Sequence, residues 1–477
     1  MLPTPLPFGF LGVFVVQASE VYMAKPNILF IITDQQRADA LGCVSDWVNT
    51  PNMDRIAAEG VRFTNCITNS PVCVPTRRTL ATGLYCHNTG VWYNGNYSLT
   101  EDTPTWMRAI RDAGYRTSLF GKTHLNGADR AGDIRNVEYL LRAQGIDDID
   151  EIVGPRGCAR TLCNMTEKWE EAGLWEHYKE DFAERFANVP WVVRPSALPL
   201  ELYYDTYVGQ RAKGYIESYD RDEPWFTWVS FGGPHEPWDT PEPYASMYNP
   251  GEMPASLDGE LREGERPEGV LDQRRRDTAA DRSPEHIAAM RANYAGNVTL
   301  IDDQLGEIFA AIDARGKWDN TVIVFASDHG EMNGDFGMIY KSNFLHSAAK
   351  VPLLVKAPGV EGGKTCDAFV EWFDIGPTLV EAAGGEIDYP QHAMSLSPCL
   401  SDTDHRIREE ALCEISNEVM VVNEKWKMAV NAEGQSYLLF DLETDPDESR
   451  NLAGLDDYRE VETDLRLRML ERILQAQ

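Results

Sequence analysis

The chain has 477 residues, of which 43% are hydrophobic and 25% are charged, so it is long enough to bury a large core. Its net charge of −32 argues against binding to nucleic-acid backbones or to anionic membranes, because both carry the same sign. An anionic substrate would therefore need a locally positive pocket.

The N-terminal residues are similar to a signal peptide, with an apolar run over Pro7–Val16 that is followed by small residues. No Lys or Arg precedes this run, and it is too short to span a bilayer. A second methionine, Met23, stands just before the first predicted strand. We therefore treat residues 1–24 as an extension and favour a cytoplasmic protein. A periplasmic or secreted protein is the alternative if residues 1–18 are a signal peptide.

The first predicted strand is Asn27–Thr33, a continuous apolar and β-branched run that indicates burial on both faces. Asp34 and Gln35 follow it directly, and open α/β sheets bind ligands at the carboxyl ends of central strands. A helix is predicted over Pro51–Glu59, because Pro favours a first turn and Gly60 ends the pattern.

The next segment, Asn69–Gly83, is a proline-punctuated loop that leads into a helix. Pro71 and Pro75 disfavour a helix before them, so Cys73 is expected near a helix N-terminus. The partial positive charge there favours anions and lowers the pKa of a thiol. Arg77 follows one turn later and can face the same point. The alternative is a buried free cysteine beside a surface arginine.

A helix over Thr105–Ala113 and a short strand over Arg116–Phe120 come next. The strand runs into Gly121-Lys122-Thr123-His124, so Lys122 and His124 are further candidates at a strand end. Residues 126–200 show no clear period and many Trp, Tyr and charged side chains. We expect this stretch to be an irregular insertion that walls a pocket.

A buried strand is predicted over Pro224–Phe231, and it ends in a turn that carries His235. The residues from Gly251 to Pro284 are rich in charge, Gly and Pro, which indicates a loop or lid. A long helix follows over Pro284–Asp313, where apolar residues recur at helical spacing.

The strand Thr321–Ser327 ends in Asp328 and His329, and Val351–Val355 continues the sheet. Strands that alternate with helices predict an α/β fold with a large, mainly parallel mixed central sheet flanked by helices, over residues 25–365. Residues 366–477 are expected to form a smaller C-terminal α+β subdomain. Its predicted elements are antiparallel strands at 426–431 and 437–442 and a final helix at 456–474.

Nine cysteines are scattered along the chain without a CxxC pair, which argues against a zinc site or a dense disulfide framework. Cys158 and Cys163 are close enough in sequence to form a disulfide.

Polar side chains thus follow four predicted strands, and a parallel sheet gathers such strand ends along one edge. Two carboxylates, a carboxamide oxygen and an imidazole among them can bind one divalent cation. The oxygen donors favour calcium, and the imidazole leaves manganese or magnesium open. The converging residues are Asp34, Gln35, Lys122, His124, His235, Asp328 and His329.

The pattern Cys73-x-Pro75-x-Arg77 followed by Thr82-Gly83 resembles the signature of the type I sulfatases, which belong to the alkaline-phosphatase-like superfamily. The resemblance extends from Lys25 to about Ala453. It rests on the motifs Pro26-Asn27 with Thr33 to Arg37, Gly121 to His124, Gly233-Pro234-His235, Ser327 to Glu331 with Lys341, Val351-Pro352-Leu353, Leu438 to Leu442, Asp445-Pro446 and Asn451 to Ala453.

This resemblance implies a sulfatase that hydrolyses sulfate monoesters of small molecules or carbohydrates. In the family the cysteine is oxidised by a maturation enzyme to formylglycine, whose hydrate is the nucleophile. Carried over by position, Arg77 would steady the hydrate, and Lys122 and Lys341 would bind sulfate oxygens. His235 would protonate the leaving alcohol, and His124 would take a proton from the hydrate. The implied metal ligands are Asp34, Gln35, Asp328, His329 and the formylglycine at Cys73.

Several positions depart from the family pattern. Val74 replaces a small polar residue that is common there, and Gln35 and His329 stand where many members carry Asp and Asn. These last two changes affect the expected identity of the metal. His346 lies where a glutamate often follows the lysine, and we assign it no role.

Two other functions are compatible with the resemblance. The first is a phosphonate monoester hydrolase or phosphodiesterase, but such relatives generally lack the Gly-Lys-x-His element. The second is a non-catalytic member that binds sulfated glycans, which the complete set of catalytic positions argues against. Candidate pocket walls, for which core or loop packing is the alternative, are Trp92, Tyr93, Asn94 and Trp106. The sequence predicts neither the sulfate ester nor an oligomeric state.

Overall fold

The computed structural model describes residues 25–95, 98–128, 131–187, 192–259, 261 and 283–477. The N-terminal extension and residues 262–282 of the predicted lid lie outside these ranges. Among the helices of the described residues, none is both long and apolar enough to cross a membrane.

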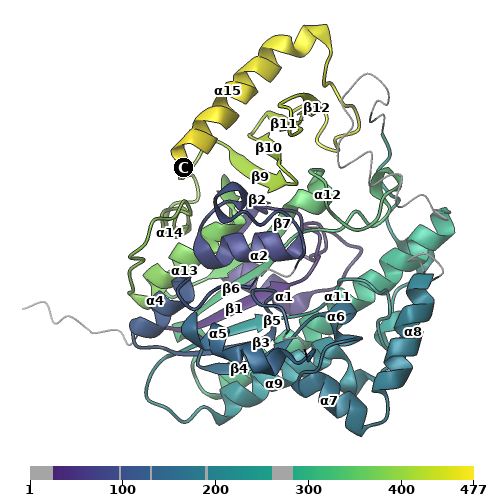
Figure 1. Ribbon diagram of the computed structural model, residues 1–477, viewed down its shortest axis with the longest axis vertical. Coiled ribbons are helices and arrows are strands. Elements are labelled where there is room, and N and C mark those ends of the chain that lie inside the picture. Colours follow the sequence, from purple (N-terminus) through teal and green to yellow (C-terminus); the bar gives the residue numbers. More distant parts are fainter. Residues whose placement is uncertain (1–24, 96–97, 129–130, 188–191, 260, 262–282) are drawn as a thin grey trace, which may run out of the picture.

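Eight strands form one sheet through the centre of the molecule (Figure 1), namely β1 (Asn27–Thr33), β2 (Val61–Ile67), β3 (Arg116–Lys122), β4 (Asp148–Ile152), β5 (Trp225–Ser230), β6 (Thr321–Ser327), β7 (Lys350–Lys356) and β8 (Lys364–Glu371). Their order is β4-β3-β5-β1-β6-β7-β2-β8. Only β7 runs antiparallel to its neighbours, β6 and β2. The predicted α/β class with a mainly parallel mixed sheet is therefore confirmed.

Helices cover both faces of this sheet, because alternate residues of each central strand point to opposite sides. Leu29 and Ile31 of β1 pack into one core with α1 (Pro51–Glu59), α9 (Tyr204–Ser218) and α11 (Pro284–Ala314). Ile28 and Phe30 pack into a second core with α4 (Trp106–Asp112) and α13 (Ile375–Ala383). Short helices elsewhere are α3 (Cys86–Thr89), α12 (His346–Ala349) and α14 (Ser397–Ser401).

A separate four-stranded antiparallel sheet lies C-terminal to the large one, which confirms the predicted smaller α+β part (Figure 1). Its strands are β9 (Ala411–Ile415), β10 (Glu418–Val422), β11 (Trp426–Val430) and β12 (Ser436–Asp441). The last helix, α15 (Arg459–Gln475), packs Leu465 and Met469 against one face of this sheet.

The end of α15 also contacts the large unit. Arg472 Nη2 lies 2.8 Å from the Tyr85 hydroxyl and 2.9 Å from a Glu371 carboxylate oxygen. The backbone oxygen of Ala476 lies 3.2 Å from Nε2 of His87 and accepts a 2.6 Å hydrogen bond from the Asn88 side chain. The C-terminus is thereby attached to α3, which follows the Asn69–Gly83 segment in the chain.

The stretch 126–200 is more regular than we predicted. Besides β4 it contains α5 (Glu138–Ala143), α6 (Pro155–Cys158), α7 (Asn164–Glu171) and α8 (Trp175–Ala187). Two of the three carboxylates of the acidic β4 are paired with arginines at the sheet edge: Asp148 with Arg116 and Asp150 with Arg211.

Strands β2 and β8 were also not predicted. The boundary expected at 365/366 falls within β8, and the division into domains remains a prediction. All nine cysteines are free thiols, Cys158 and Cys163 included.

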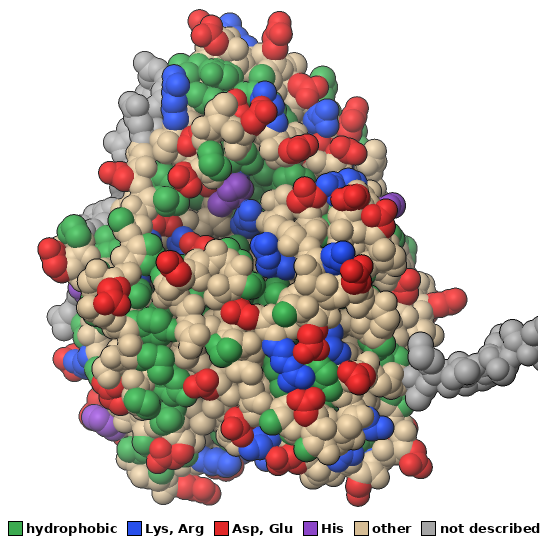
Figure 2. All heavy atoms as spheres, turned by 180° about the vertical axis from the view of Figure 1, so that it is seen from behind, with side chains coloured by type: hydrophobic (Ala, Val, Ile, Leu, Met, Phe, Trp, Pro, Cys, Tyr) green, Lys and Arg blue, Asp and Glu red, His purple; other side chains and the backbone are tan. Residues whose placement is uncertain are grey.

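Acidic side chains are spread over the molecular surface. On the face opposite the view of Figure 1 they are interspersed with Lys and Arg side chains (Figure 2). The net charge of −32 comes from the excess of 76 acidic over 44 basic residues in the whole chain.

Candidate active site

Cys73 lies at the start of the buried helix α2 (Cys73–Thr82), near a helix N-terminus as predicted. The helix start is held against the end of β6 by two hydroxyl groups. Thr68 Oγ1 lies 2.8 Å from Thr76 Oγ1 and 2.6 Å from the backbone oxygen of Asp328. The Cys73 side chain is only 1% exposed, so its surroundings decide its chemistry.

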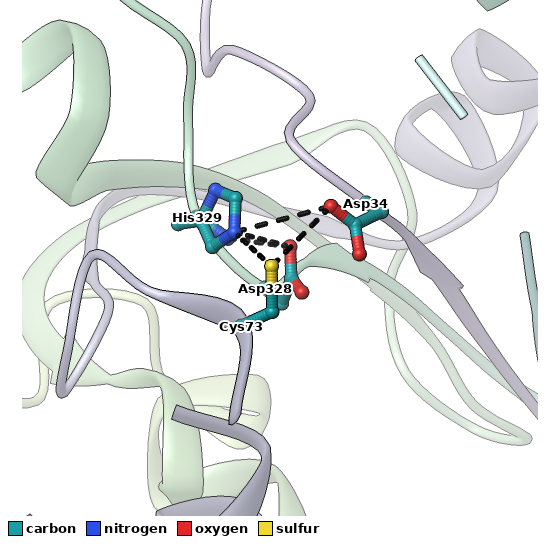
Figure 3. A group of neighbouring side chains, drawn as sticks. All are labelled: Asp34, Cys73, Asp328 and His329. Carbon is teal, nitrogen blue, oxygen red and sulfur yellow. Dashed lines mark hydrogen bonds and ion pairs between the residues drawn. The ribbon is translucent and has the colours of Figure 1, made fainter. Parts of the chain in front are cut away.

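Four side chains converge at this point, as Figure 3 shows. Asp34 follows β1 and Asp328 follows β6, and these strands are parallel neighbours, so their ends meet. His329 Nε2 lies 3.0 Å from Cys73 Sγ and 3.6 Å from Asp328 Oδ1. Asp34 Oδ1 lies 3.8 Å from Cys73 Sγ and 3.9 Å from His329 Nε2.

The donor set of this cluster fits a divalent cation. One ligand atom from each of the four residues lies within 4.8 Å of the others. The other ring nitrogen of His329, Nδ1, is 3.0 Å from the backbone oxygen of Gly330, so Nε2 is the nitrogen that faces the cluster. Two carboxylates and an imidazole are ordinary ligands of such ions.

Gln35, the fifth predicted ligand, is next to this cluster, but its side chain lies in an adjoining polar group. Its backbone N–H donates to Asp328 Oδ1 at 3.1 Å. Its carboxamide nitrogen donates to Glu236 at 2.8 Å and also to Glu331, while its oxygen accepts from Lys341. Its role as a ligand remains a prediction.

Arg77 compensates the negative charges of Asp34 and Asp328. Its guanidinium is fully buried and donates to Asp328 Oδ2 at 2.8 Å and to Asp34 Oδ2 at 3.3 Å. It also donates to Ser230 Oγ and to the backbone oxygen of Lys122. Burial and the nearby Cys73 raise the pKa of Asp34, but Lys122, His235 and Arg77 together hold that pKa well below its usual range. Asp34 is therefore ionised at neutral pH.

Lys122 and His124 both face this point from the end of β3. The Lys122 ammonium donates to Asp34 Oδ2. The strand can approach β5 this closely only with glycine at 121, since a Cβ there would lie 1.8 Å from the Ser230 backbone oxygen. Burial, Lys122 and Arg77 lower the pKa of His124 to about 4 despite its contact with Cys73, so His124 is neutral at neutral pH.

The Cys73 thiol is itself strongly affected by its neighbours. Burial raises its pKa, but the positive charges of Lys122, Lys341 and His329 outweigh burial and lower that pKa well below the ordinary value. The cluster is thus arranged to hold negative charge at position 73.

His235 lies across from these residues, in the turn after β5. Its Nδ1 is 2.7 Å from the backbone oxygen of Glu236, and its Nε2 is 4.0 Å from Asp34 Oδ1. The side chain is 7% exposed. With Nδ1–H donated to the backbone, Nε2 faces the cluster.

Asp205 of α9 holds the turn that carries His235. Its Oδ1 accepts the backbone N–H groups of Gly232 and Gly233 at 2.8 and 3.0 Å, and its Oδ2 accepts from Asn297 at 3.1 Å. A side chain at 233 would lie 2.4 Å from the Asp205 carboxylate, so glycine is needed there. Burial raises the pKa of Asp205 to about 7 although all three hydrogen bonds lower it.

A cleft of about 530 Å³ opens above Cys73. Lys122, His124 and His235 line it, together with Asn94 and Arg156. Trp92 and Tyr93 are not among its described lining residues. Of the four candidate pocket walls, Asn94 is the one among the described lining residues of this cleft. Its side-chain oxygen also accepts a hydrogen bond from the Val74 backbone N–H at 2.9 Å.

Two residues that the sequence singled out lie elsewhere. Trp106 is a core residue, 1% exposed, whose indole N–H donates to the Leu80 backbone oxygen. His346 begins α12, where its backbone N–H donates to Glu448 at 2.7 Å. It lines a different cavity, of about 310 Å³, that does not include Cys73 among its described residues.

Four buried or partly buried residues of the site were not predicted, namely Arg156, Asp205, Glu236 and Glu331. Glu236 directly follows the predicted site residue His235, and Glu331 follows His329 after one glycine. This closeness in sequence was the available signal. Arg156 comes from the stretch 126–200, where no pattern marked it. Burial and the neighbouring Glu236 raise the pKa of Glu331 to about 7.

Comparison with known proteins agrees with this geometry. A family model described as Sulfatase matches residues 26–385, and one described as N-sulphoglucosamine sulphohydrolase, C-terminal, matches residues 334–475. The chain is 29% identical to the multifunctional alkaline phosphatase superfamily protein PehA of Trinickia caryophylli and 29% identical to an arylsulfatase of Clostridium perfringens. Each match covers 91% of this chain and 92% of the relative.

Among solved structures, the phosphonate monoester hydrolase of Agrobacterium radiobacter superposes with a TM-score of 0.74 at 27% identity, covering 95% of this chain and 96% of that one. The first family model spans the whole central sheet and the Cys73 cluster. The chain belongs to the sulfatase family.

Proposed function

We propose that this protein hydrolyses sulfate monoesters to an alcohol and inorganic sulfate. The observation that carries the proposal is the position of Lys122 and His124 beside Cys73 in one cleft, with His235 on its other side. Buried cations in such a cleft stabilise the charge that develops on sulfate oxygens as the ester bond breaks. Family membership supports the same reaction.

Cys73 is proposed to be oxidised to formylglycine by a maturation enzyme. The hydrated aldehyde would supply one oxygen for attack on sulfur and a second hydroxyl for the release of sulfate. Arg77 holds the carboxylates around it, and neutral His124 is placed to take a proton from the side chain at 73. His235 Nε2 can donate a proton to the leaving oxygen on the other side.

The cluster of Asp34, Asp328, His329 and the side chain at 73, with Gln35, is proposed to hold one divalent cation. Calcium is expected first, with manganese or magnesium as alternatives. When bound, the cation would stabilise the negative charge of the sulfate oxygens and lower the pKa of the attacking hydroxyl group at position 73.

The cleft has a mixed lining. It combines asparagine, arginine, lysine and histidine side chains with glycines and with the apolar residues Val74, Ala128, Val153 and Pro155. A carbohydrate sulfate fits this lining, and aryl or other small organic sulfates are further candidates.

Phosphonate monoester hydrolysis is the second candidate, because PehA and the phosphonate monoester hydrolase of Agrobacterium radiobacter resemble the chain over nearly its full length. The two activities are compared as kcat/KM for nitrophenyl sulfate and a nitrophenyl phosphonate monoester. We expect the sulfate to be preferred. Lys122→Ala should reduce turnover of the sulfate more than that of the phosphonate, and a wild-type preference for the phosphonate would establish the alternative.

The modification is tested by peptide mass analysis of protein that was co-expressed with a maturation enzyme. The Cys73 peptide should carry an aldehyde in place of the thiol. Fully active protein with unmodified Cys73 would contradict the mechanism.

A further inference from the structure

Arg160 is a cation of the cleft that the proposed reaction does not use. It lines the same cleft of about 530 Å³ as Cys73, Lys122 and His235, and its side chain is exposed. Among the described residues, its guanidinium has no hydrogen-bond or ion-pair partner. Arg160 therefore presents a full positive charge to whatever enters the cleft.

The other two permanent cations of the described lining already have partners. The Lys122 ammonium donates to Asp34, and the Arg156 guanidinium donates to Glu236. No Asp or Glu is among the described lining residues, although acidic residues outnumber basic ones 76 to 44 in the whole chain. The cleft is thus a locally positive region of a negatively charged protein, and Arg160 is its unpaired cation.

The backbone that carries Arg160 is fixed on both sides. Before it, the Trp175 indole N–H donates to the backbone oxygen of Cys158 in α6 at 2.8 Å. After it, the backbone N–H of Leu162 donates to the Gly132 oxygen at 2.7 Å. Only the side chain of Arg160 must become ordered when a ligand binds, and this keeps the entropic loss small.

A simple sulfate monoester does not need this additional charge. Such an ester carries one negative charge, and in the proposed function Lys122 and Lys341 bind its sulfate oxygens. Arg160 is thus available for another part of the substrate. The planar guanidinium donates two parallel hydrogen bonds to a carboxylate or to a sulfate-like group, so its geometry suits a second anion.

We propose that Arg160 is a specificity-determining residue that binds a second anionic group of the substrate. This inference rests on the proposed function and narrows it to one substrate class. The class comprises sulfate monoesters that carry a further carboxylate or sulfate, such as an acidic or multiply sulfated carbohydrate. Neutral sulfate esters would bind without the contact to Arg160.

The test compares sulfate monoesters of straight-chain alcohols whose far end carries a carboxylate, a sulfonate or a neutral carboxamide. A graded series of chain lengths lets the far group reach Arg160. At the best length, wild type should prefer the anionic ester over the amide by at least about fivefold in kcat/KM. The larger of the carboxylate and sulfonate preferences identifies the kind of second anion.

Variants at position 160 then assign this preference to the guanidinium. Arg160→Gln should lower the ratio of kcat/KM for the anionic ester to that for the amide to about one. Arg160→Lys should keep part of the ratio, because it retains the charge but loses the planar fork. The wild-type ratio should also fall when salt is raised from about 0.01 M to about 1 M, since the Debye length shortens from about 30 Å to about 3 Å.

Arg450→Gln is the matched control. Arg450 is likewise exposed, has no side-chain partner among the described residues, and is absent from the described lining of the cleft. Its loss changes the net charge of the protein by the same amount, so the ratio should remain that of wild type.

Three results would overturn the proposal. They are a wild-type ratio near one at every chain length, a ratio that survives in Arg160→Gln, and an equal loss of Arg160→Gln on the anionic and neutral esters. A wild-type enzyme that cleaves none of these esters would contradict the proposed function instead. Calorimetric binding of the anionic ester and its amide to wild type and Arg160→Gln would then decide the role of Arg160 by the same ratio.

Discussion

The Asp205→Asn variant should become more stable than wild type as the pH rises. Asp205 is fully buried, and its folded-state pKa is raised from 3.8 to about 7, chiefly by burial. In the unfolded chain this carboxyl ionises near pH 4, whereas in the folded protein it stays protonated until about pH 7. The folded state therefore loses stability between these two values, and the loss sums to about 4 kcal/mol at about 1.4 kcal/mol per unit of pKa.

Asparagine removes this loss while keeping the hydrogen bonds. Its oxygen can accept the N–H groups of Gly232 and Gly233, and its nitrogen can donate to the Asn297 oxygen once that amide rotates, since among the described residues the Asn297 oxygen has no partner. The variant should thus gain on wild type from about pH 4 to pH 7 and then keep a constant lead.

Denaturant unfolding of both proteins across this range gives the difference directly. The turn that carries His235 should stay in place, so activity should be retained. A stability difference that does not change with pH would refute the reasoning, because it would show that Asp205 is ionised in the folded protein throughout.

Three further results are expected. Elemental analysis should find one divalent cation per chain in wild type and none in the Asp34→Ala, Asp328→Ala double variant, and an ion that persists in the variant would place the site elsewhere. His235→Ala should lose about 10² to 10⁴ in rate on a carbohydrate sulfate but much less on nitrophenyl sulfate, whose leaving group needs no proton. Equal losses on the two substrates would assign His235 to binding instead. Gly121→Ala should destabilise the protein by more than about 3 kcal/mol, the upper end of the cost of left-handed backbone strain alone. The extra loss is expected because the added Cβ would lie 1.8 Å from the Ser230 backbone oxygen. Gly114→Ala is the control for the last result: its φ of +93° is also left-handed, but nothing lies within 4 Å of the added carbon, so equal losses in melting experiments would rule out the collision.

The elements that sequence predicted well are those whose signals are local. Strand β1 is apolar throughout because both of its faces are covered, and its predicted bounds are the observed ones. Helix α1 begins with a proline and is followed by Gly60, so its ends were also predicted. Parallel pairing then brings the residues after β1 and β6 together, and the cluster at Cys73 follows from it.

The features that sequence could not predict depend on partners far away in the chain. Strand β4 reads as a polar surface segment until its aspartates meet Arg116 and Arg211. Glu236 and Glu331 resemble ordinary surface acids, and only the fold places both against the Gln35 amide. Asp205 lies inside a helix without a motif, and its function depends on a turn that follows the next strand.

The attachment of the C-terminus to α3 has a consequence for the order of events during biosynthesis. Ala476 lies 389 residues after His87 in the chain, so its contacts with His87 and Asn88 form only after α15 has been synthesised. The thiol of Cys73 is 1% exposed in the finished molecule, so an enzyme that modifies it cannot reach it there. If Cys73 is oxidised as proposed, we expect the oxidation to precede the docking of α15, on the nascent or still unfolded polypeptide. Purified folded protein should resist the modifying enzyme, whereas a peptide spanning Asn69–Gly83 should be a substrate.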